Sequence, residues 1–145
     1  MPTATRRQLS YAIAELMPNI IRGVQLDFFL RGGVTQTQLL VLLSVHAARQ
    51  ATMSELADGL HVTMPTVTGI VKRLVRDGHL QRVSSPSDRR QVVVRLTEKG
   101  QSFIRDFQAV IRRRWNDVLR SLSAEERGAF YRVVVKLTTR LQPVA

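Results

Sequence analysis

The segment from residue 63 to residue 100 constrains the fold most strongly, because a helical pattern there runs into two strand-like segments. Apolar residues recur at positions 67, 70, 71, 74 and 75, which is the spacing of one buried helix stripe. Thr63 can cap this helix, Pro65 fits its first turn, and Asp77-Gly78 can end it. The pattern predicts an amphipathic helix with defined ends.

The other side of this helix carries small residues and cations without an acidic residue: Pro65, Thr68, Gly69, Lys72, Arg73 and Arg76. Such a face suits a groove lined with phosphate. The ordinary alternative is a helix face that is simply solvated.

Two strand-like segments follow, at residues 80–83 and 91–96, with turn-forming residues 84–88 between them. They predict a hairpin with a long loop, whose tip carries Asp88, Arg89 and Arg90. Arginine fits a narrow, electronegative minor groove, although charged loops are common in proteins of every kind. It is the order of helix, turn, basic helix and basic-tipped hairpin that indicates DNA binding.

A first helix of a helix-turn-helix is expected just before this segment. Thr52 and Glu55 have the spacing of a capping box, Ala57 is small enough for two helices to cross closely, and residues 60–62 form the turn. His61 stands where such a turn often has glycine, so we expect a strained or rearranged backbone there. We do not interpret His61 as a metal ligand, because the other histidines lack ligand spacing to it.

These residues resemble the MarR (multiple antibiotic resistance regulator) family over nearly the whole chain. The resemblance rests on these motifs: Ser54-Glu55-Leu56-Ala57, Pro65-Thr66-Val67-Thr68, Lys72-Arg73-Leu74, Asp88-Arg89-Arg90 and Leu96-Thr97-Glu98-Lys99-Gly100. His61 departs from the usual glycine, and Pro18 is expected to interrupt a first helix that the family makes continuous. The resemblance implies a homodimer with a helical body and two wings.

Apolar stripes flank the central module. A capping box at Thr35 and Gln38 predicts a helix that its leucines bury on most sides: Leu39, Leu40, Leu42 and Leu43. A later stripe predicts a helix of about six turns: Phe103, Ile104, Phe107, Ile111, Trp115, Val118 and Leu122. A last helix begins at residue 123 with these side chains inward: Phe130, Val133, Val134, Leu137 and Leu141. The N-terminal segment adds further apolar residues: Ile13, Leu16, Ile20, Ile21 and Val24.

This is more apolar helix than the central module can cover, which indicates a dimer interface made from both chain ends. The expected fold is mainly α with a small β-hairpin wing, in which a winged helix-turn-helix module is inserted in an all-helical dimerisation body. We assign residues 1–34 to an N-terminal dimerisation region, 35–100 to the DNA-binding domain and 101–145 to C-terminal dimerisation helices.

Composition excludes several other classes. The chain has 145 residues, 44% of them hydrophobic, which suffices for one domain with a core. It has no cysteine, so disulfides, thiol-based peroxide sensing and zinc–thiolate sites are excluded. With three scattered histidines and no glycine-rich phosphate loop, we expect no enzyme, no catalytic residue, no cofactor and no metal. No apolar run could cross a membrane and no signal peptide is evident, so we expect a cytoplasmic location.

The net charge of +11 draws the chain to any polyanion without implying sequence specificity. We predict that DNA contacts come from the basic helix and the hairpin tip: Thr63, Met64, Pro65, Thr66, Thr68, Gly69, Lys72, Arg73, Arg76, Asp88, Arg89 and Arg90. Thr66, Thr68 and Lys72 are assigned to the major groove and Arg90, beside Arg89, to the minor groove. Gly69 is expected to permit close approach, and Arg73 could instead pair with Asp88.

The expected function is that of a transcriptional regulator that represses by binding a palindromic operator as a homodimer and that releases it when a small ligand binds. The resemblance implies an aromatic or phenolic ligand in a cleft between the dimer body and the DNA module. Tyr11, His46 and Arg49 are candidate lining groups, although the ordinary interpretation of each, as a capped, buried or solvated residue, is favoured over a ligand contact. The alternative is a low-specificity architectural DNA-binding protein, which footprinting would distinguish.

Overall fold

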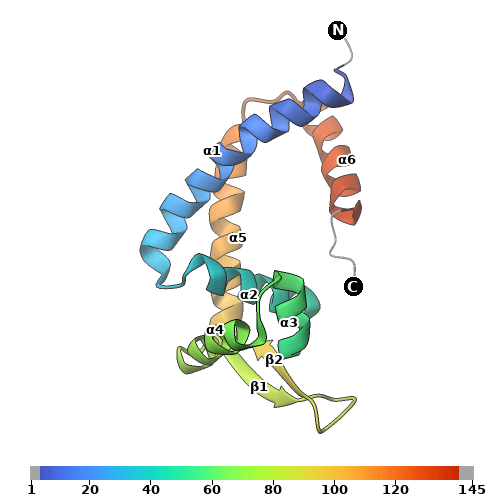
Figure 1. The fold of residues 1–145 in the computed structure, drawn as a ribbon. Coiled ribbons are helices and arrows are strands. Elements are labelled where there is room, and N and C mark those ends of the chain that lie inside the picture. Colours follow the sequence, from blue (N-terminus) through green and yellow to red (C-terminus); the bar gives the residue numbers. More distant parts are fainter. Residues whose placement is uncertain (1–3, 141–145) are drawn as a thin grey trace. The chain divides into compact units, whose positions relative to one another are not determined.

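The computed structural model describes residues 4–140, apart from the side chains of residues 25–32. Along these residues the elements are α1 (Arg6–Gly32), α2 (Gln36–Ala48), α3 (Met53–Leu60), α4 (Met64–Arg76), β1 (Leu80–Ser84), β2 (Val92–Leu96), α5 (Glu98–Leu119) and α6 (Ala124–Arg140) (Figure 1). The prediction of a mainly helical fold with a small β-hairpin wing is confirmed.

Local chemistry sets the helix starts. Both predicted capping boxes form: the backbone N–H of Thr35 donates to the Gln38 side chain at 2.8 Å, and that of Thr52 donates to Glu55 at 2.7 Å. In each box the threonine hydroxyl accepts the backbone N–H three residues on, so two N–H groups that the helix leaves unpaired are satisfied. The helices of the module therefore begin where the sequence predicts.

The interruption expected at Pro18 is wrong, because α1 continues through this residue from Arg6 to Gly32. Proline removes one backbone donor, and the other hydrogen bonds of this 27-residue helix maintain it on both sides. At His61 the expectation is confirmed: its backbone is left-handed, with φ 53° and ψ 42°, and ends α3.

The chain divides into two compact units, Met1–Val110 and Ile111–Ala145. The core of the first unit lies between Val34 and Val110 and is built from α2, α3, α4, the hairpin and the start of α5. In α2 the residues Val41, Leu42 and Val45 are fully buried, but Leu40 is 47% exposed. The expectation that α2 is buried on most sides is therefore wrong for Leu40, which lies on its outer face.

The second unit contains the end of α5 and α6, where the rings of Trp115 and Phe130 approach with centroids 5.9 Å apart. The side chains predicted to point inward from α6 are exposed in the single chain by 38–49% of their area: Phe130, Val133, Val134 and Leu137. Leu141 lies outside the described residues. Among the side chains of α1 that the structure describes, these large apolar ones are exposed as well: Leu9, Tyr11, Ile13, Leu16, Met17 and Ile21.

Within the described part of the chain, none of the helices is both long enough and apolar enough to span a membrane.

Candidate nucleic-acid interface

Helix α4 buries one side and exposes the other, as its sequence pattern predicts. Val67, Val71 and Leu74 are fully buried. The predicted contact residues of α4 and its cap are exposed, apart from the half-buried Gly69: Thr63, Met64, Pro65, Thr66, Thr68, Lys72, Arg73 and Arg76. A Cβ atom at Gly69 would meet no other heavy atom within 4 Å, so packing inside the chain gives no reason for a glycine at this position.

The start of α4 is held by threonine hydroxyls. Thr63 is the N-cap, and its Oγ1 accepts the backbone N–H of Thr66 at 3.4 Å. The two threonine Oγ1 atoms also share a hydrogen bond of 2.8 Å. Met64 follows the cap and is 47% exposed. This end of the helix therefore presents small and apolar groups to the solvent.

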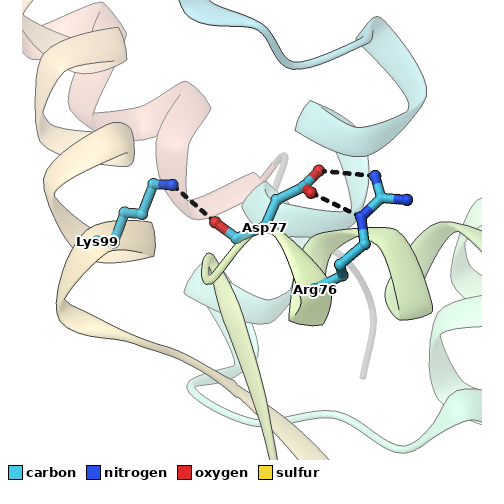
Figure 2. A network of polar contacts seen from close by, with 3 residues as sticks. All are labelled: Arg76, Asp77 and Lys99. Atoms are coloured by element: carbon cyan, nitrogen blue, oxygen red, sulfur yellow. Dashed lines mark hydrogen bonds and ion pairs between the residues drawn. The ribbon is translucent and has the colours of Figure 1, made fainter.

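The end of α4 carries an ion pair that the sequence pattern does not predict. The Arg76 guanidinium lies 2.9 Å from the Asp77 carboxylate, and Lys99 Nζ donates to the Asp77 carbonyl oxygen at 2.7 Å (Figure 2). The hydrogen bond from Arg76 holds the pKa of the Asp77 carboxyl below its usual value. Arg76 is therefore already paired with Asp77 before it meets a polyanion. The hydrogen bond from Lys99 joins the end of α4 to α5.

The two residues after Asp77 are fastened to the start of α5 through their backbone. Gly78 has a φ of 83°, and its carbonyl oxygen accepts the Thr97 hydroxyl at 2.5 Å. The carbonyl oxygen of His79 accepts the Thr97 N–H at 3.1 Å. A Cβ atom at Gly100 would collide with that same His79 oxygen. The close approach of α5 to this turn therefore depends on a glycine at position 100.

The His79 side chain is buried beside this junction. It is 8% exposed, and its ring meets that of Phe103 edge to face at 5.4 Å. Its Nδ1 atom is buried without a hydrogen-bond partner among the described residues. Burial, followed by the charge of Lys99, lowers the pKa of His79, which favours the neutral ring.

The hairpin is antiparallel, with Leu80 opposite Leu96 and Ser84 opposite Val92 (Figure 1). Its base is attached to the helix-turn-helix at Ala51, whose N–H donates to the Val94 carbonyl at 3.1 Å and whose carbonyl accepts the Val94 N–H at 2.8 Å. This bridge extends the hairpin to the connection between α2 and α3. The wing is therefore hydrogen-bonded to the rest of the module at its base.

At the hairpin tip Asp88, Arg89 and Arg90 are all exposed. The Asp88 carboxylate accepts the Arg90 backbone N–H at 2.9 Å, and the Asp88 carbonyl accepts the N–H of Gln91 at 3.0 Å. The alternative pairing of Arg73 with Asp88 does not occur among the described contacts. Asp88 instead folds the tip that presents the two arginines.

The three candidate ligand-lining residues are exposed. Tyr11 lies in α1, where the Arg7 guanidinium stands 5.9 Å from its ring centre. His46 is in the last turn of α2, and Arg49 caps that helix with a positive φ of 68°. The described contacts do not bring Tyr11 together with the other two. Across the described residues, no three His, Asp or Glu side chains gather as a metal site would require.

No sequence pattern predicts the Ala51 bridge or the Lys99 contact with Asp77, because both join residues that are remote along the chain. The spacing of the histidines argues against His79 as a metal ligand and predicts no other role for it. A histidine within an otherwise apolar turn-to-strand segment could have been recognised as a buried titratable group.

A model of the MarR family matches residues 34–92. An HTH-type transcriptional regulator of Bacillus subtilis (strain 168), YfiV, is 31% identical over 107 residues, which are 74% of this chain and 66% of that protein. The chain thus spans about two thirds of the length of this curated relative.

Solved structures share the fold. The transcriptional regulator Tm0710 of Thermotoga maritima matches with a TM-score of 0.79 and 24% identity, over 94% of this chain and 95% of that one. A variant of S. aureus MepR bound to an oligodeoxyribonucleotide matches with a TM-score of 0.68 and 22% identity, over 92% of this chain and 98% of that one.

Proposed function

Because the chain belongs to the MarR family of DNA-binding transcriptional regulators, we propose that it controls transcription by binding double-stranded DNA through α4 and the hairpin. The observation that carries this proposal is the exposed face of α4, which presents small residues followed by Lys72 and Arg73. Beside it, the wing offers Arg89 and Arg90 at an exposed tip.

In this proposal α4 enters the major groove and its N-terminal residues meet the base edges. The arginines of the tip enter the adjacent minor groove, whose negative potential attracts guanidinium groups. MepR, which shares the fold, has been solved with an oligodeoxyribonucleotide bound, and this supports a similar role here. A contact with chromosomal DNA would place the protein in the cytoplasm.

We propose that the active form is a homodimer that binds a palindromic operator. The support is the apolar surface that α1 and α6 leave exposed, including Ile13, Leu16, Val134 and Leu137. Residues 1–34 and 101–145 would form the dimerisation body and residues 35–100 the DNA-binding domain. A two-fold axis then sets the recognition helices about one DNA turn apart.

Repression with release by a small aromatic or phenolic ligand is the mode of regulation that we propose. A ligand that binds one arrangement of the two modules better than the other would shift the dimer away from the operator. Tyr11, His46 and Arg49 are its candidate contacts, each with a polar or cationic group at the surface. In this proposal the protein is a regulator and performs no catalysis.

A low-specificity architectural role is the second candidate, which the net charge of +11 favours. Selecting bound sites from a random duplex library, followed by footprinting, separates the two roles. A regulator protects one short palindrome in the presence of competitor DNA, whereas uniform protection along the duplex would establish the architectural role.

The wing is tested by Arg90→Ala, which should weaken binding to the selected site by about 1–3 kcal/mol. Arg105→Ala removes an equal charge from an exposed position of α5 and serves as the control. Equal affinity of the Arg90→Ala and Arg105→Ala variants would exclude a specific role for the wing tip.

The dimer is tested by removing residues 123–145 and, with the chain complete, by Val134→Glu in α6, where the native side chain is 38% exposed. Both changes should convert a sedimenting dimer to monomer, while Lys136→Glu on an exposed position should not. A truncated protein that still sediments as a folded dimer would exclude the proposed interface.

A further inference from the structure

The N-terminal half of α4 differs chemically from its C-terminal half. The exposed side chains of its first two turns are apolar or carry a methyl group next to a hydroxyl: Met64, Pro65, Thr66 and Thr68. No amide, guanidinium or ammonium group occurs among them, and the first charged residue along the helix is Lys72. This half is the part of a recognition helix that usually meets the base edges.

The hydroxyl groups at this end are partly committed to the helix itself. Thr63 Oγ1 accepts the Thr66 N–H, and the Thr63 and Thr66 hydroxyls bond to each other at 2.8 Å. These two hydroxyl groups therefore already form hydrogen bonds within the helix start when no partner is bound. Met64, 47% exposed, adds a flexible apolar group beside them.

In the major groove guanine and adenine are usually read by bidentate contacts from Arg, Lys, Asn or Gln. Thymine differs, because it presents a C5-methyl group that apolar side chains can contact. We infer that this chain reads thymine through its 5-methyl groups, with Met64, Thr66 and Thr68 as the specificity-determining residues. The inference rests on the proposed DNA-binding function and names the bases that this function selects.

The cations of the same face have a different task. Lys72 and Arg73 lie one to two turns further along, and Arg76 is paired with Asp77. In this inference they contact phosphate, and this includes Lys72, for which the sequence pattern alone predicts a contact in the major groove. Their attraction to phosphate depends on salt, whereas the base preference from methyl contacts does not. If Lys72 instead reached the bases, guanine would dominate the selected site.

The experiment begins with sites selected from a random duplex library by the full-length protein. Each thymine of the selected site is then replaced in turn by 2′-deoxyuridine, which lacks only the 5-methyl group and keeps base pairing. Binding should weaken about three- to fivefold per contacted thymine, the loss expected for one methyl group. Replacing that T·A pair by C·G should weaken binding further, and 5-methylcytosine at the same position should restore part of it.

Two variants of Thr68 form a matched pair. Thr68→Val keeps a methyl group and removes the hydroxyl, so it should retain the response to deoxyuridine. Thr68→Ser keeps the hydroxyl and removes the methyl, so it should bind the natural site weakly and lose little more when its partner thymine is replaced. This non-additivity, measured as a double-mutant cycle, identifies a direct methyl contact. Because Thr68 is exposed, thermal unfolding should be alike in all three proteins.

The outcomes separate this inference from the proposed function. Equal affinity for selected and random DNA overturns the proposed function itself. The preference for selected over random DNA could instead persist with deoxyuridine at every thymine position, or be lost only when 7-deazaguanine replaces guanine. Either result is consistent with the proposed regulator but overturns the inference that it reads thymine.

Discussion

The two ends of α4 are held in different ways. At its C-terminal end, the Asp77 carbonyl oxygen accepts a hydrogen bond from Lys99 at the start of α5 (Figure 2). The carbonyl oxygens of Gly78 and His79 accept hydrogen bonds from Thr97. At its N-terminal end, the described side-chain hydrogen bonds of Thr63 and Thr66 stay within the helix and its cap. One end is thus part of the packed module and the other is available to a partner.

The contrast is sharpest between two glycines. At Gly100 an added Cβ would collide with the His79 carbonyl oxygen and lie 3.0 Å from the Leu96 side chain, whereas at Gly69 it would meet nothing within 4 Å. Gly100→Ala should therefore destabilise the fold by about 1–3 kcal/mol, because backbone must move to make room.

Denaturant unfolding monitored by circular dichroism measures this effect as a lower midpoint with an unchanged slope. Gly59→Ala in α3 is the control, since a Cβ atom there also meets open space. If Gly100→Ala unfolds at the same denaturant concentration as the native chain, the tight junction at the end of α4 does not exist in solution.

Some of these features follow from local sequence patterns and others do not. Threonine caps, the apolar stripe of α4 and the hairpin follow from residues close together along the chain, so their predictions are confirmed. The Lys99 contact with Asp77 spans 22 residues and depends on how α5 returns to the module, which no local pattern encodes. Apolar periodicity likewise identifies a face of α6 but does not specify which surface covers it.

We predict that the buried His79 makes the stability of the fold depend on pH. Its pKa is lowered by burial in the folded chain, so the unfolded chain, with a histidine pKa of about 6.5, binds the proton more readily. The contribution of the neutral His79 ring to the free energy of unfolding is therefore fully present above that pH. It is lost as the pH decreases through about 6.5, by up to about 1.4 kcal/mol per pH unit.

Unfolding free energies measured between about pH 6.5 and 5.5, above the range of ordinary carboxylates, give this slope. The slope should flatten in His79→Gln and persist in His46→Gln, where the native ring is exposed. A native chain and a His79→Gln variant with the same pH slope would show that His79 takes up its proton as easily when folded as when unfolded.

At the exposed side of α4, Gly69→Ala should have opposite effects on folding and on binding. Alanine is more favourable than glycine in a helix interior by about 0.5–1 kcal/mol, and the added Cβ meets no heavy atom within 4 Å. The denaturant midpoint of unfolding should therefore rise. DNA affinity should fall, since the predicted role of Gly69 is to let DNA approach the helix. Gly59→Ala should gain similar stability and keep its DNA affinity, and a Gly69→Ala variant that binds DNA as well as the native chain would exclude close approach.

The smallest expected effect concerns the exposed pair of Arg76 and Asp77. Asp77→Asn frees the Arg76 guanidinium, so affinity for selected and random DNA should rise together by a few-fold, with a steeper dependence on salt. Arg76→Ala should lower both affinities and reduce the salt slope by about one unit.

Asp117→Asn is a matched control, because Asp117 also pairs with an exposed arginine, Arg120, at 3.4 Å. If Asp117→Asn raises DNA affinity as much as Asp77→Asn does, overall charge explains the gain and Arg76 has no privileged contact with phosphate. If instead Arg76→Ala narrows the gap between selected and random DNA, Arg76 reads bases, and specificity is not confined to the free end of α4.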